Sequence, residues 1–97
     1  MKDPRIEQIA DYYGLPNQIN MLIEESAEFI QAVNKAKRAN GADEYKVAVE
    51  HMEEELADVI IVAKQLRYLF GKDNIDRIID AKLDRQIERI KKEVNNG

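Results

Sequence analysis

Residues 24–58 read EESAEFIQAVNKAKRANGADEYKVAVEHMEEELAD, with an acidic cluster at each end and Gly41 between them. On both sides of the glycine, apolar residues recur at the three- and four-residue spacing of an amphipathic helix. Glycine is the usual residue just past a helix end, because it adopts left-handed backbone conformations without strain. The stretch therefore predicts two helices that fold back on each other at residues 41–42.

The same helical spacing extends over the rest of the chain and predicts four helices. They span about residues 4–13, 16–40, 43–70 and 75–94. Gly14, Gly41 and Gly71 stop the first three, and Asp73 or Asn74 caps the fourth. The predicted fold is all-α, an antiparallel four-helix bundle that forms a single domain over residues 1–97.

Apolar stripes on three of these helices form the predicted core. On the second helix the stripe consists of Ile19, Leu22, Ile23, Phe29, Ile30 and Val33. On the third it consists of Met52, Leu56, Val59, Ile60, Ala63, Leu66 and Phe70. On the fourth it consists of Ile75, Ile79, Leu83, Ile87, Ile90 and Val94.

The composition limits the class of protein. A chain that is 44% hydrophobic and 35% charged is globular, and a chain without cysteine has neither disulfides nor thiolate chemistry. The net charge of −4 argues against a nucleic-acid polymer as partner, and no apolar run is long enough to span a membrane. We expect a soluble cytoplasmic protein. Because 97 residues form a small core, we also expect a homo-oligomer.

Four acidic residues occupy matching positions on the second and third helices. In a hairpin that turns at residues 41–42, residues whose numbers sum to about 83 lie at equal height. Glu28 then faces Glu55, and Glu25 faces Asp58. Both pairs lie at the edge of an apolar stripe, where an unpaired carboxylate is costly. The spacing predicts that these four carboxylates converge.

Converging carboxylates repel one another, and a hard divalent cation relieves that repulsion. Oxygen ligands suit Mg²⁺, with Mn²⁺ as a substitute. His51 is the only imidazole, so zinc and a ferritin-like di-iron centre are less suitable. His51 itself is expected to be structural or exposed. The alternative to a metal site is a salt-bridged surface seam.

Basic residues share one face of the fourth helix. Lys82, Arg85, Arg89 and Lys92 follow 3, 4, 3 spacing. This face suits phosphate binding, since arginine forms planar bidentate contacts. A solvated face with local ion pairs to Glu88 is an equal alternative.

Two motifs and one longer segment resemble a known family. EESAE at residues 24–28, followed by EEELAD at residues 53–58, resembles the EExxE…ExxD signature of the MazG-like, all-α nucleoside triphosphate pyrophosphohydrolases. AKLDRQIERIKK at residues 81–92 resembles the basic fourth-helix segment of the compact, phage-type members. The resemblance covers about residues 13–92.

The resemblance implies a fold of the all-α NTP pyrophosphatase type and hydrolysis of a (deoxy)nucleoside triphosphate between its α- and β-phosphates. The products are the monophosphate and pyrophosphate. By resemblance, the metal ligands are Glu25, Glu28, Glu55 and Asp58, the residue that activates or orients water is Glu24, and the phosphate contacts are Lys82 and Arg89 with support from Arg85. The family also implies homodimers or homotetramers with sites completed across subunits. This chain departs from many relatives in having Gln86 in place of an asparagine.

Two alternative functions stay open from the sequence. One is a phosphoribosyl-ATP pyrophosphohydrolase, which has the same fold and chemistry. The other is a non-catalytic helical interaction module, for which alanine at Glu25 or Asp58 would be neutral or stabilising.

Overall fold

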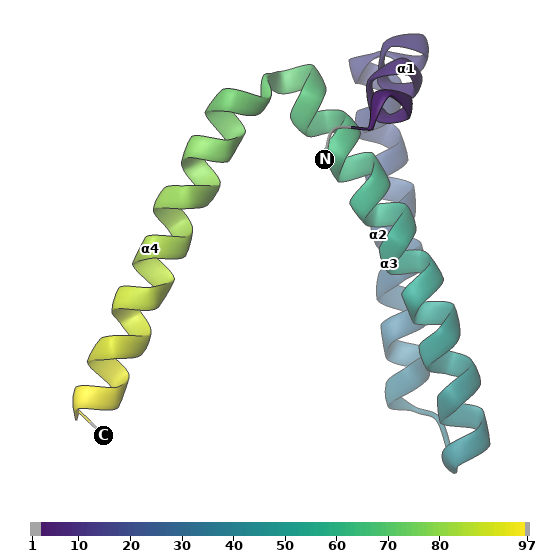
Figure 1. Ribbon diagram of the computed structural model, residues 1–97. Coiled ribbons are helices and arrows are strands. Elements are labelled where there is room, and N and C mark those ends of the chain that lie inside the picture. Colours follow the sequence, from purple (N-terminus) through teal and green to yellow (C-terminus); the bar gives the residue numbers. More distant parts are fainter. Residues whose placement is uncertain (1–2, 97) are drawn as a thin grey trace.

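The computed structural model describes residues 3–96, and nearly all of them are helical (Figure 1). The helices are α1 (Pro4–Tyr13), α2 (Leu15–Lys37), α3 (Ala42–Phe70) and α4 (Lys72–Asn96). Gly14, Gly41 and Gly71 separate them, with φ of 81°, 82° and 106°. Residues 3–96 contain no strand, so the predicted all-α class with four helices is confirmed.

Two helix boundaries differ from the sequence prediction. Helix α2 ends at Lys37 rather than near Asn40, so its C-cap is Arg38, and Gly41 is the N-cap of α3 rather than the stop of α2. Helix α4 begins directly after Gly71. Asp73 and Asn74 therefore lie in the first turn of α4, where an acidic side chain stabilises the helix dipole without capping it. At the other end of the chain Asp3 caps α1 by accepting a hydrogen bond of 3.0 Å from the Arg5 amide.

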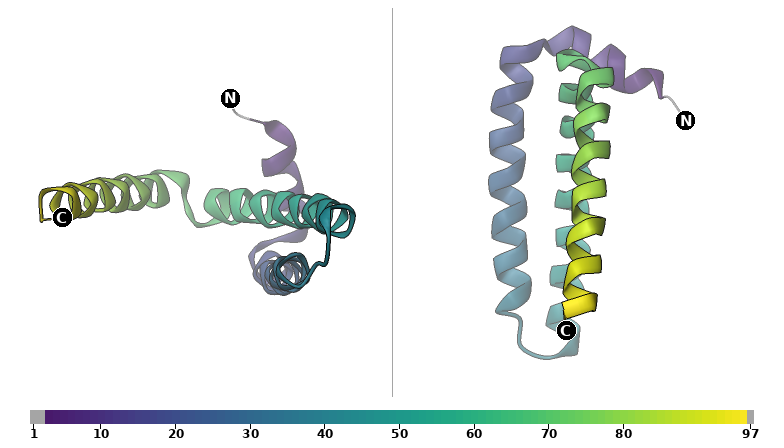
Figure 2. Two further views of the ribbon diagram at one scale, coloured as in Figure 1. Left: turned by 90° about the horizontal axis from the view of Figure 1, so that it is seen from below. Right: turned by 90° about the vertical axis from the view of Figure 1, so that its left-hand side faces the viewer.

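Helices α2 and α3 form an antiparallel hairpin along most of their length (Figure 2). Helix α1 lies across the open end of this hairpin (Figure 1). There the Tyr68 hydroxyl donates a hydrogen bond of 2.9 Å to the Asp11 carboxylate and ties α1 to the end of α3.

The core between these helices consists mostly of small side chains, together with Leu66 and one amide pair. The buried residues are Ala10, Gln18, Ala32, Ala36, Ala48, Val62, Gln65 and Leu66. Gln18 and Gln65 are 3% and 2% exposed, and the Gln18 Nε2 donates a hydrogen bond to the Gln65 Oε1. Their numbers sum to 83, which agrees with the expected register of the hairpin.

The predicted core is largely wrong for a single chain. Of the third-helix stripe only Leu66 is buried, whereas Leu56, Ile60 and Phe70 are 42%, 44% and 56% exposed. Ala63 is exposed as well. The reason is that α2 and α3 contact each other through facing residues whose numbers sum to about 83. The broad apolar stripes lie beside this row of facing residues, which we call the hairpin row. On α2 and α4 the exposed stripe residues are Ile19, Ile23, Ile30, Ile79, Leu83, Ile87, Ile90 and Val94.

Helix α4 leaves the hairpin at an angle and does not pack along it (Figures 1 and 2). Over residues 3–96 its only neighbouring helix is α3. The radius of gyration is 17.4 Å, whereas a compact domain of this length has about 13 Å. A single chain is therefore a hairpin with a projecting fourth helix rather than a closed bundle. No helix within the described range has the length and apolar character needed to cross a lipid bilayer.

Candidate metal centre

Three carboxylates meet between α2 and α3. Glu25, Glu28 and Glu55 each offer one oxygen, and these three oxygens all lie within 4.8 Å of one another. Glu25 and Glu28 are three residues apart on α2 and share one face, while Glu55 lies opposite Glu28 in the register set by the hairpin. The structure thus brings together three of the four acids expected to converge.

Asp58 lies at the rim of this cluster. Its side chain is exposed, and its carboxylate is not part of the three-oxygen group. Its charge nevertheless acts on the cluster, because repulsion from Asp58 contributes to the raised pKa values of Glu25 and Glu55. Asp58 is therefore near enough to contribute to a shared site.

Two oxygens of the cluster are buried without a hydrogen-bond donor. They are the Glu25 Oε2 and the Glu55 Oε2. Burial is the main cause that raises the pKa of both carboxyls, followed in each case by repulsion from Glu28. Placing unsatisfied carboxylates here costs stability, since the charged form loses water and gains a negative neighbour.

His51 borders the cluster on the side of the hairpin bend. Its Nε2 lies 3.7 Å from the Glu55 Oε1, and its side chain is 52% exposed compared with 13% for Glu55. Attraction to a protonated His51 opposes part of the rise in the Glu55 pKa. This placement agrees with a partly solvated histidine at the helix edge.

The donor set fits a hard divalent cation. All ligands on offer are carboxylate oxygens, which Mg²⁺ and Mn²⁺ prefer, and the open rim leaves room for water. A cation between these groups would satisfy the two buried oxygens and remove the repulsion that raises the carboxyl pKa values. The residues present therefore fit the metal that the sequence predicts.

The remaining predicted site residues lie outside the cluster. Glu24 is exposed beside Glu25, and its charge contributes to the raised pKa of Glu25. Lys82, Arg85 and Arg89 are exposed on α4, which has no contact with α2. Within one chain the structure does not bring these basic residues to the carboxylates (Figure 1).

Polar pairs between helices were missed by the sequence reasoning. The Gln18–Gln65 pair obeys the rule that paired numbers sum to 83, so the rule applied beyond the acids would have found it. Arg67 and Asp76 form an ion pair with N–O distances of 2.5 Å across the α3–α4 junction. No spacing rule covers residues on two sides of a helix break, so residue spacing does not predict this pair.

Comparison with known proteins supports the family that the sequence motifs resemble. A family model described as the MazG nucleotide pyrophosphohydrolase domain matches residues 16–94, a range that includes every predicted site residue. Neither curated proteins nor solved structures gave a match. Because the family match covers nearly the whole chain, the resemblance expected from the sequence is confirmed, and the chain belongs to the MazG nucleotide pyrophosphohydrolase family.

Proposed function

We propose that this protein hydrolyses (deoxy)nucleoside triphosphates between the α- and β-phosphates in a reaction that depends on a divalent metal. The observation that carries the proposal is the cluster of Glu25, Glu28 and Glu55, with two buried oxygens that lack a hydrogen-bond donor. Membership of a nucleotide pyrophosphohydrolase family supports the reaction class. A non-catalytic module has no use for such a costly cluster.

Glu25, Glu28, Glu55 and Asp58 would hold Mg²⁺, or Mn²⁺ in its place. When bound, the metal neutralises phosphate charge and lowers the pKa of a bound water. Glu24 orients the attacking water and takes its proton. The water oxygen bonds to the α-phosphorus, the bond from that phosphorus to the bridging oxygen breaks, and pyrophosphate leaves. Positioning and electrostatics supply most of the catalysis in such phosphoryl transfers.

The basic residues of α4 bind the substrate phosphates. Arg85 and Arg89 offer planar guanidinium groups, and Lys82 offers a point charge. Since α4 projects away from the carboxylates of its own chain, we propose that these side chains serve the site of a neighbouring copy.

The exposed surface supports a homodimer or homotetramer. The chain exposes 7855 Å², whereas a compact monomer of 11.2 kDa exposes about 5,700 Å². The excess is roughly 2,000 Å² per chain, which is in the range that obligate homodimers bury. Large apolar side chains on α2, α3 and α4 are among the exposed residues.

A partly open cavity of about 630 Å³ lies beside the carboxylate cluster. His51, which lies next to Glu55, is one of its lining residues. Its other lining residues are Lys35, Asp43, Glu44, Val47 and Ala48. Its size is within the usual range of small-molecule sites. We propose that it accommodates the part of the nucleotide beyond the triphosphate.

Hydrolysis in ¹⁸O-labelled water tests the proposed bond cleavage. Attack at the α-phosphorus places the label in the nucleoside monophosphate, and we expect all of it there. Label in pyrophosphate, or release of inorganic phosphate, would contradict the proposal. Phosphoribosyl-ATP should be included among the compounds tested, because preferential hydrolysis of it would identify the alternative activity.

A further inference from the structure

The direction of α4 depends on its junction with α3. Helix α4 contacts only α3 among the described helices, and only Ile75 and Asp76 of α4 are partly buried. Gly71 breaks the two helices apart with φ of 106°. Within one chain, the interactions at this junction therefore decide where the rest of α4 points.

Arg67 and Asp76 join the two helices across the break. The Arg67 Nε donates to the Asp76 Oδ1, and the Nη2 donates to the Oδ2, both at 2.5 Å. These bonds raise the pKa of Arg67 and lower that of Asp76. Two parallel hydrogen bonds between planar groups restrict rotation more than one bond does.

Other ion pairs of the described chain have local roles. Asp3 pairs with Arg5 at the start of α1, His51 lies beside Glu55 on α3, and Glu88 pairs with Lys91 on α4. Each joins residues within one helix or its cap. Arg67–Asp76 differs, because its partners are nine residues apart on two helices.

We propose that Arg67 and Asp76 are positioning residues, whose ion pair fixes the direction of α4 and so aims its basic face at substrate phosphates. The role of the basic face in binding substrate phosphates rests on the proposed function. The role of the ion pair in fixing the direction of α4 does not. Neither residue touches substrate in this account. The pair acts through the helix that it orients.

The length of α4 makes its direction important. Arg89 lies 13 residues beyond Asp76, which is about 20 Å along a helix. A change of roughly 10° at the junction then moves Arg89 by about 3–4 Å, which exceeds the tolerance of a hydrogen bond. A loosened junction therefore weakens phosphate contacts without altering any basic residue.

Spin-label distances measure the direction of α4. The chain has no cysteine, so Glu50→Cys on α3 and Glu93→Cys on α4 give two unique label sites, both exposed. Dilution with unlabelled protein isolates distances within one chain. We expect a narrow distribution in the parent, broad distributions in Arg67→Ala and Asp76→Ala, and no further broadening in the double variant. Arg67→Lys retains the charge but only one hydrogen bond, so the width of its distance distribution should be intermediate between those of the parent and Arg67→Ala.

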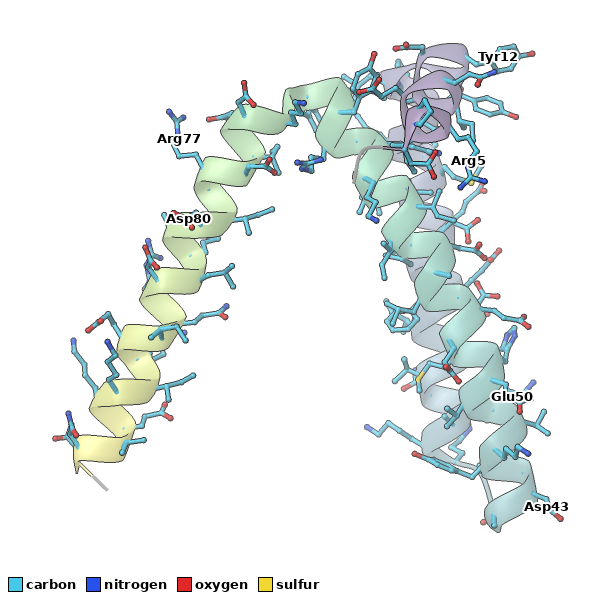
Figure 3. The ribbon with its side chains drawn as sticks, viewed as in Figure 1. Arg5, Tyr12, Asp43, Glu50, Arg77 and Asp80 are labelled. Atoms are coloured by element: carbon cyan, nitrogen blue, oxygen red, sulfur yellow. The ribbon has the colours of Figure 1, made fainter. Side chains whose placement is uncertain are left out.

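Arg77→Ala is the matched control. Arg77 lies next to Asp76, projects from the side of α4 away from the hairpin, and bonds to Asn74 within α4 (Figure 3). Arg77→Ala should leave the distribution of spin-label distances narrow. A distribution that stays narrow in Arg67→Lys and in both alanine variants, with circular dichroism unchanged, would overturn the proposal.

Kinetics test the second half of the proposal. We expect KM for a turned-over nucleotide to rise about 5–10-fold in Arg67→Ala and Asp76→Ala, with a smaller change in kcat and no change in Arg77→Ala. Broadened distances with unchanged KM would overturn the link between α4 direction and phosphate binding. A parent protein without activity on any nucleotide would contradict the proposed function, while the distance measurement would still decide the role of the pair.

Discussion

Gln18 and Gln65, 47 residues apart in sequence, are hydrogen-bonded to each other inside the α2–α3 hairpin. Gln18 lies seven residues before Glu25, and Gln65 lies seven residues after Asp58, which is about 10 Å along each helix. A slip in register would leave two buried amides unpaired, and each unpaired polar group costs about 1–3 kcal/mol. The pair therefore favours the register that brings the glutamates together.

Leucine substitutions test this role of the amide pair. Gln18→Leu or Gln65→Leu leaves one buried amide without its partner and should lower the free energy of unfolding by about 1–3 kcal/mol. The double variant removes both polar groups and should be nearly as stable as the parent. Urea unfolding measures this, with Gln31→Ala on the exposed face of α2 as a control that stays within about 0.5 kcal/mol. Single variants as stable as this control would argue against a paired amide.

The raised pKa values of Glu25 and Glu55 predict a pH dependence of stability without metal. Their folded-state pKa values lie above the ordinary value of 4.5, so the folded state holds protons that the unfolded state has lost. In EDTA the unfolding free energy should therefore fall as pH rises from about 5 through these raised pKa values. The lowered carboxyl pKa values of Asp3 and Asp76 act only at lower pH.

Thermal unfolding in EDTA at pH 5 and pH 7.5 measures this dependence. Glu55→Gln should flatten it, because glutamine does not titrate. Mg²⁺ should stabilise the parent at pH 7.5 and stabilise Glu55→Gln much less, since a ligand that binds only the folded state raises stability. Equal stabilisation of both proteins by Mg²⁺ would place the metal elsewhere.

Substitution within the cluster separates an enzyme from a binding module. Glu28→Ala and Asp58→Ala should each lower kcat/KM at least about 100-fold, because they remove groups that hold the metal. Circular dichroism should stay helical. Glu53→Ala, which removes an exposed acid on the same helix, should leave activity within about twofold. Parent-like turnover in both cluster variants would withdraw the assignment of these carboxylates.

Mixing two inactive variants tests whether α4 serves a neighbouring copy. Glu28→Ala lacks a working cluster, and the double variant Lys82→Ala/Arg89→Ala lacks two of the basic side chains. If sites form across subunits, a mixed oligomer contains some sites with an intact cluster and an intact basic face. Activity should reappear after the two proteins are unfolded together and refolded. Persistent inactivity of verified mixed oligomers would favour action within one chain.

Local patterns predicted the helices, the stops at Gly14 and Gly71 and the height of facing residues in the hairpin, whereas Gly41 precedes α3 and does not end α2. The spacing that placed Glu28 opposite Glu55 also holds for Gln18 and Gln65. The stripe that includes Leu56 and Ile60 was predicted to be buried but is exposed in a single chain. Apolar periodicity identifies the face of a helix that is suited to packing, but it does not identify the element that packs against that face. The direction of α4 depends on Gly71 and on contacts between helices, such as Arg67–Asp76, which periodicity does not encode.

The most direct test of the central claim is pyrophosphate release from a panel of canonical and modified (d)NTPs, in Mg²⁺ and in EDTA. We expect release that requires the divalent metal, with one nucleoside monophosphate formed for each pyrophosphate. Release that continues in EDTA would contradict the role of the Glu25–Glu28–Glu55 cluster. Absence of release from every nucleotide in the panel would contradict the proposed activity.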